Sequence, residues 1–402
     1  MEILNETPFE VEAIPCMGPE NKTVLTIIVK GTFDMIPETP AESASEQIPV
    51  AFGDEYYHEA EGGSVKFESD VAPFKPRADI VLVGHAYAPK GTLKRAVDTS
   101  LRVGQVRKTI RVYGDRQWQL LSRLLPASPS EPQPFSNMDL VYERAFGGID
   151  KEGGGFCEQN LVGCGFFEKK SAKDLDGAPL PNLEDPNNLI RSWKDHPNPV
   201  GFGFYGRAWM PRRGFLGTYD DKWRKERSPD PPEDFRFEYY NGAHPDLQVN
   251  GFLKGDEEVE LVNVTPEEEI GFRLPGISLS CNVRKIISPL ESESLDESDD
   301  HADDIEYVED EDFEDEDMID EFEDDDMDEE FDDDYMDEEF DEEDIYDEFE
   351  GDEEQSFVDE EVKLNIDTLC LIPDEKRFYM VWRGLCPIQD LGALEVKTVE
   401  IR

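Results

Sequence analysis

Stretches of apolar and β-branched residues, interrupted by glycine and proline, recur along most of the chain. Residues 24–29 form the run VLTIIV, and Gly31 and Pro37 close the segment that follows; this pattern predicts a buried central strand. Residues 106–113 alternate with a period of two, and Lys108 falls on the same side as the apolar positions. Such alternation is typical of an antiparallel strand with one face in water.

The same signals predict further strands at 234–241, 257–264, 278–287 and 393–401, a hairpin of 78–89 with 93–104, and a hairpin over 362–384 that turns at 373–376. Helical patterns are scarce and predict short helices at 118–125 and 221–227. Residues 134–200 are rich in Gly and Asn and predict long loops. We therefore expect a mainly β fold, an antiparallel β-sandwich or barrel-like arrangement of sheets with long Gly/Pro-rich loops and few short helices.

Charge is distributed very unevenly along the 402 residues. The formal net charge is −57, and residues 291–361 alone hold 45 Asp and Glu with no Lys or Arg. The remaining chain carries 51 acidic and 39 basic residues. An ordinary, mildly acidic protein therefore carries one extremely acidic segment.

This acidic segment contains a nine-residue repeat of aromatic residues, Phe313, Phe322, Phe331, Phe340 and Phe349. Neither a helix nor a strand gathers residues at this spacing into one apolar stripe. At such charge density the segment cannot bury enough surface to offset its ordering entropy. We expect a β-rich body at 1–290, a disordered acidic insertion at 291–361, and C-terminal strands at 362–402 that complete the body.

The cysteine pattern and the N-terminal residues indicate in which cellular compartment the protein is expected. The six cysteines show no C-x-x-C pair, which suits reduced thiols. The N-terminal sequence has no basic and apolar leader, and the run at 24–29 is too short to span a membrane. These features predict a soluble cytoplasmic protein that does not act at a membrane.

No motif for a cofactor, a metal or a catalytic nucleophile occurs in the chain. The five histidines lack zinc-site spacing, the glycine clusters at 147–148 and 153–155 lack a following G-K-[ST], and no G-x-S-x-G is present. We expect no metal, no cofactor and no enzymatic activity. The alternative is an enzyme of unknown reaction with a site in the loops around 195–213, built from Asp195, His196 and Arg207.

A run of basic and aromatic residues follows these loops and consists of Trp209, Arg212, Arg213, Trp223 and Arg227. One interpretation is structural, with Arg stems and Trp rings packed over a sheet and paired with neighbouring acids. The other is a protein-binding site, because Trp, Tyr and Arg dominate such sites. The structural interpretation is favoured. The surplus of acid elsewhere argues against nucleic-acid binding.

Several segments carry a family resemblance, and they read IIVKGTFDMIP, KPRADIVLVGHAYAP, PFSNMDLVYERAFGG, GFYGRAWMPRR, GTYDDKWRKERSPDPPEDFRFEYYNGAHPDLQ and GFLKGDEEVELVNVTPEEEIGFRLPG. In this order they resemble a bacterial family of unknown biochemical function whose genes lie in type VI secretion clusters. Members are regarded as adaptors or chaperones that load a toxic effector onto the secretion spike. The resemblance spans most of residues 9–276 and implies two partners, a secreted effector and the spike protein.

The acidic segment admits three interpretations beside this resemblance. It could be a solvated spacer that improves solubility. It could also be a binding arm that attracts a basic effector through its carboxylates, with Phe322, Phe331 and Phe340 adding short apolar contacts. Weak calcium binding is a third interpretation, although the segment lacks the ordered ligand spacing of an EF-hand loop.

Overall fold

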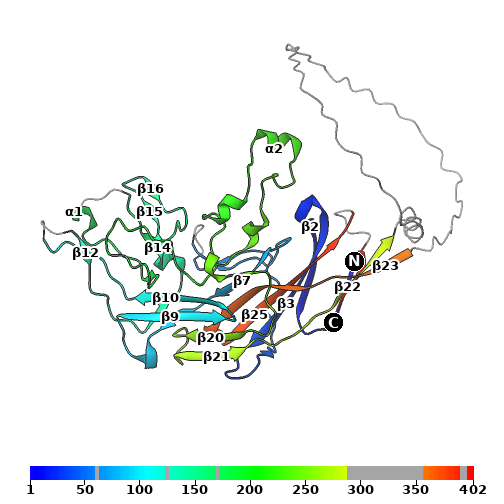
Figure 1. Ribbon diagram of the computed structural model, residues 1–402, viewed down its shortest axis with the longest axis horizontal. Helices are drawn as coiled ribbons and strands as arrows, with labels where there is room; N and C mark the ends of the chain where they lie inside the picture. The colour runs from blue at the N-terminus through cyan, green and yellow to red at the C-terminus, as the bar shows by residue number, and fades with distance from the viewer. Residues whose placement is uncertain (59–62, 123–125, 169–171, 288–355, 390–395) are drawn as a thin grey trace, which may run out of the picture. The chain divides into compact units, whose positions relative to one another are not determined.

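The computed structural model describes residues 1–402 except 59–62, 123–125, 169–171, 288–355 and 390–395. Met1–Ile286 and Phe357–Arg402 form one compact unit, shown as ribbons in Figure 1. Phe322, Phe331 and Phe340 lie outside the described residues, as does most of the acidic segment. Its predicted disorder therefore stays a prediction.

The largest sheet has seven strands, in the order β19-β7-β24-β25-β3-β2 with β4 paired to β3. Its strands are β2 (Glu10–Met17), β3 (Thr23–Asp34), β4 (Glu42–Ser43), β7 (Arg77–Leu82), β19 (Gln248–Asn250), β24 (Asn365–Ile372) and β25 (Arg377–Pro387). Neighbouring strands are antiparallel except β7 and β24. The predicted strand at 24–29 and the predicted hairpin at 362–384 are confirmed, and they lie side by side as β3 and β25.

Two further sheets complete the main framework. The five-stranded sheet has the order β18-β10-β9-β20-β21 and comprises β18 (Leu183–Glu184), β10 (Val106–Tyr113), β9 (Ala96–Val103), β20 (Glu258–Val262) and β21 (Glu269–Arg273). The four-stranded sheet has the order β1-β26-β22-β23 and comprises β1 (Glu2–Asn5), β26 (Val396–Ile401), β22 (Cys281–Ile287) and β23 (Ser356–Glu361). The strands predicted at 106–113, 257–264, 278–287 and 393–401 are thereby confirmed. The fold is mainly β, as predicted, and its sheets are mostly antiparallel.

One apolar cluster contains residues of all three large sheets. At its centre, the ring of Phe378 on β25 stacks on Phe33 of β3 at 5.3 Å and on Phe272 of β21 at 5.4 Å between centroids. Phe378 alternates with Tyr379 along β25, so the two residues lie on opposite faces of the sheet. The five-stranded sheet therefore packs on the Phe378 face of the seven-stranded sheet, as in a sandwich.

The remaining elements are short and lie in the long connections. The short strands are β5 (Glu55–Tyr56), β6 (Val65–Phe67), β8 (His85–Tyr87), β11 (Trp118–Gln119), β12 (Ser128–Pro129), β13 (Asn137–Asp139), β14 (Phe146–Gly147), β15 (Ile149–Asp150), β16 (Gly155–Phe156) and β17 (Cys164–Gly165). The helices are α1 (Ala172–Leu175) and α2 (Asp221–Glu226), with 3-10 turns η1 (Pro19–Asn21), η2 (Pro89–Gly91), η3 (Tyr142–Arg144), η4 (Arg212–Phe215), η5 (Phe237–Tyr240), η6 (Pro245–Leu247) and η7 (Pro373–Glu375). In the described part of the chain, no helix has the length and hydropathy that a membrane crossing requires.

Three local predictions are wrong. The helix predicted at 118–125 is absent from its described residues, because Trp118 is buried in a small second cluster and β11 pairs with β12. The hairpin predicted from 78–89 and 93–104 does not form, since β7 and β9 belong to different sheets. The strand predicted at 234–241 is instead the turn η5, whose aromatic rings pack on one another.

The boundary of the acidic insertion also needs correction. Its last six residues, Ser356–Glu361, form the strand β23 at the edge of the four-stranded sheet. Arg284 on β22 holds this strand through two hydrogen bonds to Asp359, at 2.7 and 2.9 Å. Charge pairing across the strands explains the order of residues that their acidic composition alone predicted to be disordered.

Candidate functional site

The face of the seven-stranded sheet opposite Phe378 carries buried charged residues. They form three ion pairs, Lys30–Asp70 at 2.7 Å, Lys75–Asp79 at 2.9 Å and Arg383–Asp367 at 2.5 Å. Asp79 also accepts backbone N–H bonds from Gly242 and Ala243, at 2.8 and 3.2 Å. A buried charge is tolerated when it is paired and hydrogen-bonded, and these pairs fix the covering loops to the sheet.

Arg212 belongs to this buried polar layer. Its side chain is 3% exposed, and its guanidinium pairs with Glu68 at 2.6 Å. It also donates to the carbonyl oxygens of Tyr205, at 2.6 Å, and Tyr239, at 3.0 Å. Arg207 pairs with the same carboxylate at 2.8 Å. Arg212 therefore ties together the two ends of the segment 205–239, which is a structural role.

Trp209 is buried beside Arg212 in a cluster of aromatic rings. Its centroid lies 5.2 Å from that of Tyr142 and 5.3 Å from that of Tyr205, both at edge-to-face angles. A Cβ atom on Gly206 would lie 2.6 Å from the Trp209 ring, so only glycine fits there. The sequence G-R-A-W thus folds into a tight turn around the indole. Trp209 is a core residue.

The second half of the basic-aromatic run lies on a lobe of residues 214–235 that carries α2 and projects from the sheets in Figure 1. The Trp223 ring packs edge-on against Tyr219 at 4.6 Å, and its Nε1–H donates to the Asp230 carbonyl at 2.8 Å. The Asp220 side chain caps α2 by accepting the Trp223 N–H at 2.8 Å. Arg227 lies 3.6 Å from Glu233. Trp223 and α2 are therefore held by contacts within the lobe, whereas Phe235 at its base packs against Phe237 of η5.

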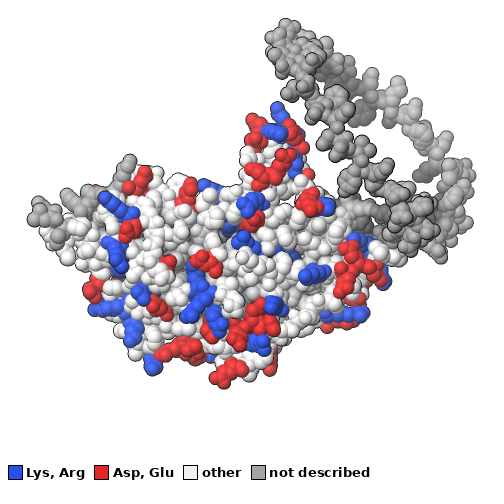
Figure 2. Space-filling model, viewed as in Figure 1, with Lys and Arg blue, Asp and Glu red and all other residues white. Residues whose placement is uncertain are grey.

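The surface of this lobe combines aromatic and charged groups. Tyr219 is 52% exposed, and a hollow of about 190 Å³ is lined by residues that include Trp223, Arg227 and Glu233. Figure 2 shows Lys, Arg, Asp and Glu side chains intermixed over the lobe. Arg213 lies at its base, exposed and 3.4 Å from Glu158. The structure therefore divides the predicted site: Trp209 and Arg212 are internal, Arg213 lies at the surface, and Trp223 and Arg227 build the lobe.

A larger pocket, of about 620 Å³, adjoins the aromatic cluster. Four parts of the chain meet at it: the loop at Gln159, residues 185–200, residues 205–211 and the turn η6 with the preceding His244. Tyr205 and His244 both line the pocket, with their rings 5.9 Å apart. The sequence had given His244 no role beyond the absence of zinc-site spacing; the segments GFYGRAWMP and YNGAHPD, which supply several of the lining residues, were the signal that could have indicated this pocket.

His244 has a fixed tautomer and both of its ring nitrogens are occupied. Nδ1 accepts the Asp246 N–H at 3.1 Å and lies 3.3 Å from Lys108 Nζ, while Nε2–H donates to the Pro199 carbonyl at 3.1 Å. Burial, and then the charge of Lys108, lowers the pKa of His244 to about 4. The imidazole is therefore neutral near pH 7. It holds η6 against the loop at Pro199, and neither nitrogen faces the pocket as a free base.

The residues of the enzyme alternative have separate structural partners. Asp195 accepts the N–H groups of Arg191 and Ser192, at 2.9 and 2.8 Å. His196 Nε2 lies 3.2 Å from the Phe167 carbonyl, and Arg207 pairs with Glu68. Within the described ranges, no hydrogen bond or ion pair joins any two of Asp195, His196 and Arg207, and no group of His, Cys, Asp and Glu has a metal-binding arrangement.

His85 takes part in a charged cluster that sequence analysis missed. Nδ1 lies 2.7 Å from Asp374 in the turn η7, and Nε2 lies 2.9 Å from Asp139 on β13. Tyr87 donates to Asp374 at 2.7 Å. The hydrogen bond to Asp374 raises the pKa of His85. This cluster fastens the β24–β25 turn to the paired strands β8 and β13.

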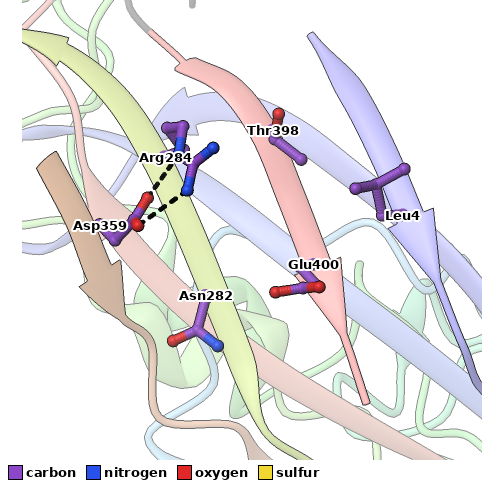
Figure 3. A pocket seen from close by; sticks show the side chains of 6 residues that line it. All are labelled: Leu4, Asn282, Arg284, Asp359, Thr398 and Glu400. Atoms are coloured by element: carbon purple, nitrogen blue, oxygen red, sulfur yellow. Dashed lines mark hydrogen bonds and ion pairs between the residues drawn. The ribbon is translucent and has the colours of Figure 1, made fainter. Parts of the chain in front are cut away.

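The outer face of the four-stranded sheet forms a third hollow, of about 380 Å³. Figure 3 shows side chains from all four strands along it, with Arg284 directed at Asp359. The polar Asn282 and Arg284 alternate with the buried Val283 on β22, as expected for a strand with one face in water. Arg284 is the one basic residue among the described lining residues of this hollow, and it is already paired with Asp359.

One of three comparisons with known proteins identified a family. The chain belongs to the family described as "uncharacterized protein conserved in bacteria (DUF2169)", whose model matches residues 20–383. The match covers the five-stranded sheet, the seven-stranded sheet except β2 and the end of β25, the lobe and the 620 Å³ pocket. No curated protein and no solved structure matched the chain.

Proposed function

We propose that this protein is a non-enzymatic cytoplasmic adaptor for type VI secretion, which binds a toxic effector and helps to load it onto the spike protein. The secretion system comes from the sequence resemblance described above. The observation that carries a binding role is the lobe 214–235, which presents Tyr219 and mixed charges on an internally hydrogen-bonded support.

The lobe has the composition and the construction of a protein-binding surface. Exposed tyrosine, tryptophan and arginine side chains contribute most of the free energy in many protein interfaces. A support that is already folded reduces the entropy lost on binding. Lys222 and Glu226 lie one helical turn apart on α2, so the lobe offers charges of both signs beside Tyr219. Such mixed charge favours specificity for one partner.

The contacts of the residues considered for catalysis support the same proposal. His244 and His196 donate to or face backbone carbonyls, and Arg207 is paired with Glu68.

The acidic segment adds 45 carboxylates between residues 291 and 361, which would attract a basic effector over long range. Binding through the lobe and electrostatic attraction by the segment are separate contributions.

The test is capture of partners from the native cytoplasm by the full chain. The variant Tyr219→Ala with Lys222→Glu should lose about tenfold or more of the captured effector or spike protein, because one hot-spot side chain contributes about 2 kcal/mol. The matched control is Tyr56→Ala with Lys22→Glu, which changes another exposed tyrosine and lysine. Equal capture by both variants, or capture of neither an effector nor a spike protein, would reject the proposal.

The acidic segment is tested separately by deleting residues 291–355, which leaves β23 intact. If the segment binds a basic effector, deletion should weaken capture at low salt and have little effect at high salt, because salt screens exposed charges. Capture that is independent of both the deletion and salt would identify the segment as a spacer.

A further inference from the structure

We infer that the pocket beside His244 binds an arginine or lysine side chain, carried by an extended segment of the partner protein. The inference rests on the proposed function in that it names the part of the partner that this pocket would hold. The pocket is separate from the lobe surface, since the two hollows share no lining residue.

The charge of the pocket lining carries this inference. Asp185 and Asp246 line the pocket, and no Lys or Arg is among its described lining residues. Asn188 and Asn198 add amide carbonyl oxygens. A cation therefore finds several acceptors at this site, whereas an anion would face two carboxylates, of which Asp246 is balanced by the buried Lys108 and Asp185 has no basic partner among the described residues.

Both carboxylates keep one oxygen for a ligand. Asp246 uses Oδ2 for Lys108, at 2.6 Å, and its side chain is 64% exposed. Lys108 is only 7% exposed and lies on the sheet side of this pair. Asp185 uses Oδ1 for Asn187, at 2.9 Å. Among the described residues, no hydrogen bond reaches Oδ1 of Asp246 or Oδ2 of Asp185 from another side chain.

The walls suit the aliphatic stem of a long basic side chain. The lining includes the apolar or ring-bearing side chains of Tyr205, Met210, Pro211, Pro199 and Pro245. Arg and Lys bury their methylene groups against such apolar surfaces while the charged end stays hydrogen-bonded. The neutral His244 ring adds apolar wall without opposing positive charge. The volume of about 620 Å³ leaves room for backbone beside the side chain.

The experiment compares two blocked tripeptides, acetyl-Gly-Arg-Gly-amide and its citrulline analogue, on the full chain by ligand-observed NMR. Citrulline keeps the shape of arginine and removes its charge. The arginine peptide should bind about tenfold more tightly, because a hydrogen bond between charged groups exceeds a neutral one by about 1.4 kcal/mol or more. High salt suppresses non-specific binding to the acidic segment.

Two variants assign this binding to the pocket. Asp185→Asn keeps the acceptor for Asn187 and removes one charge, and Asn188→Lys adds a cation at an exposed position of the rim. Each should weaken the arginine peptide about fivefold to tenfold. The matched control is Asp256→Asn, an exposed carboxylate paired with Arg273 outside the pocket; its affinity should equal that of the parent.

Equal binding of both peptides, or unchanged affinity in both pocket variants, would overturn the inference. Selective arginine binding that Asp185→Asn weakens would support it even if the lobe variant captured its partners normally. That combination would reject the proposed function of the lobe and retain the pocket, so the two failures are distinguishable.

Discussion

The two halves of the basic-aromatic run contain the same residue types and differ in almost everything else. Trp209 and Arg212 lie inside the protein, where the guanidinium has three partners and the indole touches two tyrosine rings. Trp223 and Arg227 lie on the lobe, and within the described part of the chain their side-chain hydrogen bonds, ion pair and ring contact are all with residues of the lobe. Residue composition alone therefore does not distinguish buried structural residues from residues of a surface lobe. The two kinds are distinguished by the partners that each side chain contacts.

This difference has a direct energetic meaning. Removing one partner of a buried ion pair leaves an unpaired charge away from water, which costs far more than losing a solvent-exposed pair. The internal half should therefore control stability, whereas the lobe should control recognition with little effect on global stability. Of the three predictions that follow, in order of decreasing effect, the first and the last test this separation directly, and the second tests the buried histidine beside the internal half.

The largest effect is expected for Arg212→Met. Methionine fills similar volume but leaves Glu68 with Arg207 alone and leaves the Tyr205 and Tyr239 carbonyls without this donor. We expect the free energy of unfolding to fall by about 3–5 kcal/mol, measured by urea denaturation. The matched control is Arg227→Met. The Arg227 side chain is 25% exposed and its guanidinium lies 3.6 Å from Glu233, which is 77% exposed; the substitution should change stability by less than about 1 kcal/mol. Similar losses in the two variants would abolish the proposed distinction.

The second effect concerns His244 and depends on pH. Its folded pKa is lowered to about 4, whereas an unfolded histidine titrates near 6.5. Between these values the unfolded chain binds one more proton, so the contribution is fully present above pH 6.5 and is lost as pH falls toward 4. We expect the parent to lose on the order of 2 kcal/mol more than His244→Gln between pH 7 and pH 4.5. Parallel stability curves for parent and variant, from denaturation at each pH, would contradict this interpretation.

The main sheets could be predicted from the sequence because their signals are local. The alternation over 106–113 and the apolar residues of 24–29 report directly which side chains face a core. The failures share another cause. Residues 234–241 have strand-forming aromatic residues, yet those rings pack on one another in η5. Tertiary contacts decided the outcome there, and propensity could not report them.

The candidate site was only partly predictable for a related reason. The sequence indicated Trp209, Arg212 and Arg227 as candidates, because tryptophan and arginine are typical of protein interfaces. It could not show that Glu68, 144 residues before Arg212, neutralises that arginine. Nor could it show that Lys108, on a predicted strand face, reaches Asp246. Pairings across such sequence separations depend on the fold.

The smallest effect on global stability is expected for Trp223→Ala. The indole packs on Tyr219 and donates to Asp230, so its loss should loosen the lobe. Since these contacts stay within residues 214–235, the global free energy of unfolding should change by less than about 1 kcal/mol, while the lobe opens locally. Hydrogen exchange should become about tenfold faster for amides of the lobe and stay unchanged for β3 and β25.

The same substitution at Trp209 provides the comparison that makes this result informative. Trp209→Ala removes a buried ring from the cluster with Tyr142 and Tyr205, and a cavity of that kind costs about 3–5 kcal/mol. Exchange should then accelerate throughout the sheets, because the whole unit unfolds more often. If Trp223→Ala instead lowered the global stability as much as Trp209→Ala, the lobe would be part of the core, and its aromatic residues would no longer be available as a separate binding surface.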